Sequence, residues 1–318
     1  MKVAFIGLGN VGSKLAGTLI RNNITTFVSD LDKSAAKKLI KMGGKWTDNP
    51  YDATIQADVI ITCLPSPKVS AHVAQGPKGI LEAATKGKIW IEMSTTQSSE
   101  VIRLGDKFLE KGMLSADCPV SGGCHRANTG NIAIFAGCDR PIFERIKPIL
   151  CVLGKKVLHT GPLGSASTLK VMTNFLATTH LVACCEALVA MKAANVDLNT
   201  TYEAIKISSG NSFVHETESQ VILNGSRDIN FTLDLVLKDI ALFQEIASQN
   251  KIDLEISPLL NEIIKNAIDK LGPRANSPSI ISLLEQQTGM KILAPGFPSE
   301  IQDDEPESLG YEVTTVKE

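Results

Sequence analysis

The sequence has few aromatic residues and almost no net charge. Phe, Trp and Tyr make up 5% of its 318 residues, and 32 Lys and Arg stand against 34 Asp and Glu, which leaves a formal charge of -2. Basic patches that attract phosphate groups and aromatic platforms that stack bases are therefore in short supply. This composition argues against a nucleic-acid partner.

The chain also lacks the cysteine spacings of a disulfide framework or a metal site. The cysteines are odd in number and include no CxxC pair; they are Cys63, Cys118, Cys124, Cys138, Cys151, Cys184 and Cys185. We therefore expect reduced thiols, no bound metal, and a cytoplasmic or otherwise reducing compartment.

Long apolar segments are missing as well. The N-terminal apolar run, Val3 to Leu8, is too short and too rich in glycine for a secretory signal peptide. The longest run without a charged residue lies between Lys170 and Glu186. This run is shorter than the roughly 18 residues that suggest a membrane span, so we expect no membrane partner.

What the first half of the chain does contain is an alternation of short apolar runs with helix-like stretches. The runs read KVAFIGLG, TTFVSD, DVIITCLP, KIWIEMST, MLSADCPV, NIAIFAG and KVLHTG. This alternation is typical of βαβ units, and the nearly continuous apolar runs indicate strands covered by helices on both faces. We predict an α/β fold in which residues 1–162 form a Rossmann-type, doubly wound parallel sheet.

After Gly164, helical periodicity replaces the strand-like runs. The predicted helices span 164–194, 198–209, 213–223, 231–250, 256–271 and 277–288. We predict an all-helical domain over 163–293 that begins with a long interdomain helix and serves substrate binding and dimerisation. Its helices carry more apolar surface than one small domain covers, which predicts a homodimer or homotetramer. The acidic residues 294–318 are expected to form a loosely ordered tail.

A glycine-rich motif follows the first predicted strand at once and opens a helical stretch. It reads Gly7-Leu8-Gly9-Asn10-Val11-Gly12, a G-x-G-x-x-G pattern in its strand-turn-helix context. Such glycines permit a tight turn and the close approach of a pyrophosphate, and the start of the helix adds unpaired N–H groups. These six residues are the predicted dinucleotide site.

The residue that ends the second predicted strand indicates which dinucleotide binds. Asp30 stands where a carboxylate accepts hydrogen bonds from the ribose hydroxyls and repels a 2′-phosphate. Of the residues that follow, only Lys33 would favour NADP. We therefore predict NAD as the cofactor in preference to NADP.

Several motifs follow one another over residues 1 to about 290. In order they are FIGLGNVG, CLP, MSTT, DCPVSGG, the pair Lys170 and Asn174, and Leu237-Lys238-Asp239. Together they resemble the β-hydroxyacid dehydrogenase family, which includes 3-hydroxyisobutyrate dehydrogenase.

The resemblance implies a role for each matching residue. Lys170 would be the catalytic residue, and Asn174 would orient the substrate. The substrate carboxylate would be held by Ser121, Gly122 and Gly123. The residues that would contact the cofactor or line its cleft are Leu64, Pro65, Thr95 and Lys238.

Elementary chemistry supports three of these roles. A Ser-Gly-Gly turn offers a hydroxyl group and unobstructed N–H groups to an anion. Lys170 and Asn174 are four residues apart and therefore share one helix face. Oxidation of an alcohol requires a base for the hydroxyl proton, and a partly neutral lysine can serve as that base.

The sequence thus predicts NAD-dependent oxidation of a small 3-hydroxy acid, such as 3-hydroxyisobutyrate, to its semialdehyde. Two alternatives stay open: an NADPH-linked reductase of a small semialdehyde of the tartronate or succinic type, and a dinucleotide-binding module without catalysis. His125 and Arg126 stand where the family often has small residues, and they are candidates for tuning substrate identity.

Overall fold

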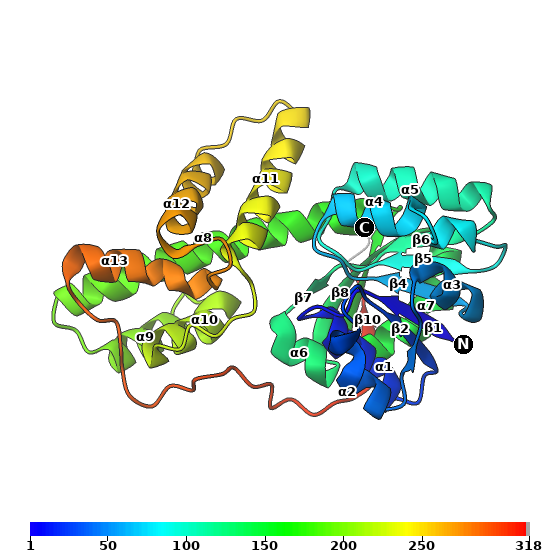
Figure 1. Ribbon diagram of the computed structural model, residues 1–318. Helices are drawn as coiled ribbons and strands as arrows, with labels where there is room; N and C mark the ends of the chain where they lie inside the picture. The colour runs from blue at the N-terminus through cyan, green and yellow to red at the C-terminus, as the bar shows by residue number, and fades with distance from the viewer. Residues whose placement is uncertain (316–318) are drawn as a thin grey trace. The chain divides into compact units, whose positions relative to one another are not determined.

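The computed structural model describes residues 1–315, which divide into two compact units (Figure 1). Of the described residues, unit 1 comprises 1–170 and 303–315, and unit 2 comprises Val171–Gln302. The division falls within one long helix, α8 (Ser165–Ala193), a few residues later than the predicted boundary at 162/163.

Unit 1 is built on a mostly parallel sheet with the strand order β10-β9-β8-β6-β5-β4-β1-β2-β3, and β7 pairs with β8. The strands are β1 (Val3–Ile6), β2 (Thr26–Ser29), β3 (Lys45–Trp46), β4 (Val59–Thr62), β5 (Ile89–Glu92), β6 (Leu114–Asp117), β7 (Val120–Ser121), β8 (Ile132–Gly137), β9 (Gly154–Gly161) and β10 (Tyr311–Val313). All seven predicted apolar runs contain a strand. The two-residue strands β3 and β7 and the C-terminal strand β10 were not predicted as separate strands.

Alternating residues of the central strands pack on opposite faces of the sheet. Val3 and Phe5 belong to one buried cluster, whereas Ala4 and Ile6 belong to another. The first cluster includes residues of α1 (Gly12–Arg21) and α7 (Arg140–Leu153). The second includes residues of α3 (Pro50–Gln56), α4 (Pro67–Gln75) and α5 (Ser98–Glu110). Because side chains alternate along a strand, a continuous apolar run buries both faces, as predicted.

The direction of the later strands differs from the prediction of a wholly parallel sheet. β8 is antiparallel to β6 and β7, and β9 and β10 are parallel to β8. The chain between β7 and β8 contains only the short helix α6 (Gly123–Thr129). Neighbouring antiparallel strands need no long crossover, and an apolar run gives no sign of its own direction.

Unit 2 is helical, as predicted. Its helices after α8 are α9 (Leu198–Lys206), α10 (Phe213–Asn224), α11 (Leu233–Gln249), α12 (Ile256–Leu271), η3 (Ser277–Ile280) and α13 (Ile281–Thr288). The remaining short helices of unit 1 are η1 (Lys33–Ala36), α2 (Lys37–Lys41) and η2 (Ile80–Glu82). Among the described residues, α8 is the one helix that is long and apolar enough to cross a membrane, by length and composition alone. The core helix of a water-soluble protein meets the same criteria.

The C-terminal segment, residues 303–313, is not the loosely ordered tail that its composition suggested. Its strand β10 extends the sheet along β9, with Glu312 opposite Val157. The Glu312 carboxylate forms ion pairs with Arg140 (2.5 Å) and Lys147 (2.8 Å) of α7. The sequence-based expectation was wrong because the basic partners of these acidic residues lie far away along the chain.

Glycine at position 310 is required for β10 to dock. The Gly310 N–H donates to the Cys151 carbonyl (2.7 Å), and a Cβ atom at Gly310 would lie 1.9 Å from the carbonyl oxygen of Gly154. Gly310→Ala should therefore displace β10 and destabilise the protein by about 1–3 kcal/mol. Thermal unfolding and proteolysis of the C-terminal segment measure this effect. Leu309→Ala is the matched control because Leu309 is exposed; equal stability of the two variants would contradict the prediction.

Candidate active site

The three glycines of the G-x-G-x-x-G motif occupy different environments in the turn between β1 and α1. A Cβ atom at Gly7 would lie 2.3 Å from the Cys63 carbonyl oxygen, and one at Gly12 would lie 2.1 Å from the Gly7 carbonyl oxygen. A Cβ atom at Gly9 would meet nothing within 4 Å. Gly7 and Gly12 therefore serve close packing, whereas the space above Gly9 is open. This open cradle fits the pyrophosphate of a dinucleotide.

The turn is tied to the end of β2 by the carboxylate of Asp30. The buried Leu8 donates its N–H to Asp30 Oδ2 (2.6 Å), and Asp32 donates its N–H to Asp30 Oδ1 (2.9 Å). Asn10 is exposed and Val11 is half-buried at the start of α1. Asp30 thus stands at the carboxyl end of its strand beside the turn, as the sequence predicted. A carboxylate at this place suits recognition of the adenosine ribose.

The loops after β4 and β5, which carry Leu64, Pro65 and Thr95, are joined through a fully buried glutamate. Ser94 donates its N–H (2.9 Å) and its hydroxyl to Glu92 Oε1, and Leu64 donates its N–H to Ser94 Oγ (2.7 Å). Burial raises the pKa of Glu92, although the hydrogen bonds from Ser94 oppose that shift. Sequence analysis assigned no role to Glu92 or Ser94, since their contacts join separate loops.

The predicted carboxylate-binding loop joins β7 to α6. Gly122 and Gly123 both have positive φ angles, 129° and 84°. Residues that carry a Cβ atom rarely adopt such angles, so glycine suits both positions. Arg126 lies over the loop, because its Cδ is 3.2 Å from where a Cβ of Gly122 would be. Burial, aided by the positive charge of Arg126, lowers the pKa of His125.

A buried aspartate connects the strand that leads to this loop with α8. Asp117 Oδ1 accepts the N–H of Gly164 (2.8 Å), and Asp117 Oδ2 accepts the N–H of Ser167 (2.6 Å). These N–H groups belong to the start of α8, where a helix has no backbone partner for them. Burial raises the pKa of Asp117, while the hydrogen bonds to Gly164 and Ser167 oppose the increase. Sequence analysis quoted Asp117 in a motif but missed this contact.

The predicted catalytic lysine lies on α8 shortly after this cap. Lys170 is only 7% exposed, which is unusual for a lysine. Asn174 follows one helical turn later, so both side chains lie on the same face of α8.

In unit 2, Asp239 contacts two of the predicted site residues, Asn174 and Lys238. The buried carboxylate of Asp239, on α11, accepts a hydrogen bond from Asn174 Nδ2 (2.5 Å). It also forms an ion pair with Lys238 Nζ (2.7 Å). Because the amide group of Asn174 faces a carboxylate, its carbonyl oxygen is directed away as a hydrogen-bond acceptor. Sequence analysis gave Asp239 no role of its own.

Comparison with known proteins identifies the family. Residues 2–161 match the family described as the NAD binding domain of 6-phosphogluconate dehydrogenase. Residues 164–284 match the family described as NAD-binding of NADP-dependent 3-hydroxyisobutyrate dehydrogenase. The chain belongs to the β-hydroxyacid dehydrogenase family. It is therefore an NAD(P)-dependent dehydrogenase that acts on a CH–OH group.

Individual relatives span nearly the whole chain. It is 29% identical over 293 residues to 2-(hydroxymethyl)glutarate dehydrogenase of Eubacterium barkeri, covering 92% of this chain and 97% of the relative. The chain is 28% identical over 292 residues to the mitochondrial 3-hydroxyisobutyrate dehydrogenase of Rattus norvegicus, and the match covers 90% of this chain and 87% of the relative. The solved Mycobacterium tuberculosis 3-hydroxyisobutyrate dehydrogenase with L-serine shares its fold, with a TM-score of 0.78, 23% identity, and coverage of 89% and 98%.

The different environments of Gly9 and Gly12 predict opposite effects of the same substitution. Gly9→Ala should leave thermal stability nearly unchanged and weaken dinucleotide binding by on the order of tenfold, because the added methyl group fills the open cradle. Gly12→Ala should instead destabilise the protein by about 1–3 kcal/mol. Thermal unfolding and titration with NAD and NADP separate the two effects. If Gly9→Ala bound the dinucleotide with unchanged affinity, the pyrophosphate would not lie against Gly9 and the prediction would be wrong.

Proposed function

We propose that the protein catalyses NAD-dependent oxidation of a small 3-hydroxy acid, such as 3-hydroxyisobutyrate, to its semialdehyde. The observation that carries this proposal is the enclosure of Lys170 at the start of a helix whose first N–H groups are bound by Asp117. Asp117 ends the strand that leads into the Ser121–Gly123 loop. The proposed base and the proposed anion-binding loop are thus both positioned by elements that meet at the buried Asp117.

Each of the protein's own residues then has a chemical task. Ser121, Gly122 and Gly123 hold the substrate carboxylate through the serine hydroxyl and the loop N–H groups. Asn174, whose amide is fixed by Asp239, orients the substrate by donating the second N–H of its Nδ2 to the substrate hydroxyl oxygen. Lys170 Nζ takes the hydroxyl proton, and it returns a proton in the reverse direction. Bound NAD supplies the hydride acceptor.

Replacement of the lysine tests this assignment. Lys170→Met should lower turnover by about 10²- to 10⁴-fold, the usual contribution of a general base, while the affinity for NAD stays near that of the wild type. Lys192→Met is the matched control because Lys192 is an exposed lysine on the same helix. Steady-state turnover of 3-hydroxy acids and NAD titration provide the readouts. A Lys170→Met enzyme that keeps most of its turnover would refute the assignment.

The preference for NAD rests on Asp30. Its carboxylate stands beside the glycine turn, where it would bind ribose hydroxyls and repel a 2′-phosphate. Asp30→Ala should therefore shift the ratio of kcat/KM values towards NADP by about tenfold or more. Asp32→Ala removes an exposed carboxylate from the same loop and should leave the ratio unchanged. An unchanged ratio in Asp30→Ala would mean that the carboxylate does not select the cofactor.

The reductase alternative uses the same residues in the opposite direction. The family matched by residues 164–284 is described for an NADP-dependent enzyme, which keeps this alternative open. Assays of semialdehydes with NADPH, run beside 3-hydroxy acids with NAD, compare the two directions. Faster turnover of a semialdehyde with NADPH would favour the reductase.

We further propose a homodimer or homotetramer in a reducing compartment such as the cytoplasm. Large apolar residues that remain exposed on α8 and α12, including Leu176, Met191 and Leu259, support assembly. All seven cysteines are free thiols, which is consistent with a reducing environment.

A further inference from the structure

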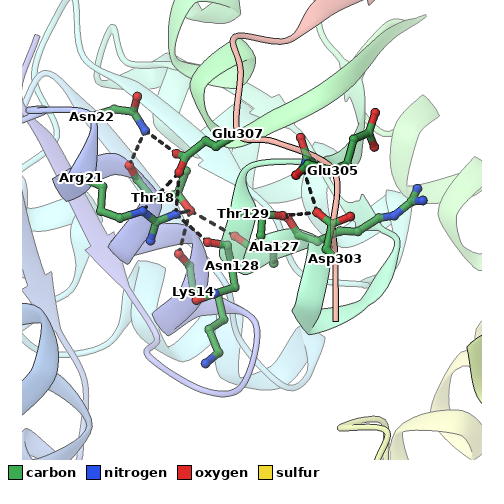
Figure 2. A network of polar contacts seen from close by, with 12 residues as sticks. Lys14, Thr18, Arg21, Asn22, Ala127, Asn128, Thr129, Asp303, Glu305 and Glu307 are labelled. Atoms are coloured by element: carbon green, nitrogen blue, oxygen red, sulfur yellow. Dashed lines mark hydrogen bonds and ion pairs between the residues drawn. The ribbon is translucent and has the colours of Figure 1, made fainter. Parts of the chain in front are cut away.

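The two helices that leave the candidate binding loops are joined at their far ends by the C-terminal segment. Helix α1 begins at Gly12 of the dinucleotide turn, and α6 begins at Gly123 of the carboxylate-binding loop. The C-terminal segment lies across the opposite ends of both helices (Figure 2). It lies beyond the residues that match the two families, which end at residue 284.

Asp303 holds the end of α6. Its Oδ2 accepts hydrogen bonds from the Thr129 hydroxyl and from Asn131 Nδ2 (2.7 Å), and Figure 2 shows Asp303 facing Thr129. Asn131 Nδ2 also donates to the Glu305 carbonyl oxygen (2.7 Å). Burial opposes ionisation of Asp303, but the hydrogen bonds from Thr129 and Asn131 hold its pKa below the usual range. Asp303 therefore acts on α6 as a carboxylate.

Glu307 holds the end of α1 in a similar way. It accepts a hydrogen bond from Asn22 Nδ2 (2.8 Å) and forms an ion pair with Arg21 (3.4 Å). Arg21 in turn donates to the Asn128 carbonyl oxygen of α6 (2.5 Å), and Thr18 donates to that of Ala127 (3.1 Å). The end of α6 is thus bound both by the C-terminal segment and by α1 (Figure 2).

Helix α6 depends on such external contacts for its position. It has only seven residues, and helices of this length are marginal without tertiary support. Glycines with positive φ angles precede and follow it: Gly122 at its start and the left-handed Gly130 at its end. Glycine restricts the backbone least of all residues, so the chain at the two ends of α6 does little to fix the helix. A contact at Thr129 therefore influences the position of the whole helix and of the loop before it.

We propose that Asp303 is a positioning residue for the substrate. Through Thr129 and Asn131 it fixes α6, and through α6 it fixes the Ser121–Gly123 loop in the arrangement that binds the substrate carboxylate. Asp303 itself does not touch the substrate. This inference rests on the proposed function for its kinetic consequence, although the contact between Asp303 and α6 does not depend on that function.

The kinetic test compares acidic residues of the same chain region. Asp303→Asn preserves size but removes the charge, and it should raise the KM for the 3-hydroxy acid about tenfold. Its kcat and its affinity for NAD should stay within about twofold of the wild type, because the base and the dinucleotide turn are unchanged. Asp304→Asn removes the adjacent, exposed carboxylate. Glu312→Gln weakens the other anchor of the C-terminal segment, at α7.

A purely structural role makes a different prediction. In that case Asp303→Asn and Glu312→Gln would change KM alike, in proportion to their effects on thermal stability.

Thr129→Val removes the hydroxyl that donates a hydrogen bond to Asp303, and it should raise the KM for the 3-hydroxy acid as Asp303→Asn does. If the two residues act as one contact, the double variant should be little worse than either single variant. Independent, additive effects of the two substitutions would overturn the proposal.

Amide hydrogen exchange tests the contact without turnover. Asp303→Asn should speed exchange over residues 121–130 in the full-length protein, whereas Asp304→Asn should not. Unchanged exchange and an unchanged KM in Asp303→Asn would overturn the inference. A wild-type protein that turns over no 3-hydroxy acid, but in which Asp303→Asn still speeds exchange at α6, would refute the proposed function and leave the contact with α6 standing.

Discussion

The carboxylate of Asp117 joins the central sheet to α8, and the geometry of the candidate site follows from that contact. Two backbone N–H groups at the start of α8 bind the two carboxylate oxygens of a fully buried side chain. A buried carboxylate without partners is costly, and so is a buried helix start without partners, so each satisfies the need of the other. The contact fixes the first turns of α8 and hence the position of Lys170.

The same arrangement recurs along the carboxyl edge of the parallel strands. Asp30 accepts the N–H of Leu8 after β2, and Glu92 binds Ser94 after β5, while Ser94 in turn binds Leu64 after β4. Asp30, at the end of β2, binds the loop after β1 directly, whereas Glu92, at the end of β5, binds its own loop and reaches the loop after β4 through Ser94. Ligands of open α/β sheets bind at this edge, so the candidate ligand-binding loops are held in place by carboxylates at the strand ends.

Acidic side chains of the C-terminal segment also fix neighbouring elements, here the helices α1, α6 and α7. Glu312 pairs with α7, Glu307 with α1, and Asp303 with the end of α6. Individual exposed ion pairs contribute little to stability, but strand pairing and several polar contacts act together here. The extra strand also covers the edge of β9, which would otherwise present unpaired backbone groups.

The sequence by itself determined most of the local structure, including the glycine turn between β1 and α1. Apolar runs and helical periodicity predicted the main strands and helices because these signals depend on neighbouring residues, and the environments of Gly7, Gly9 and Gly12 agree with the motif. Only the tertiary structure decided the reversed direction of β8, the order of the C-terminal segment and the contacts of Asp117, Asp239 and Asp303. Each of these depends on partners distant along the chain, which composition and periodicity do not reveal. An acidic residue looks the same in a solvated tail and in a buried contact until the fold brings its donors to it.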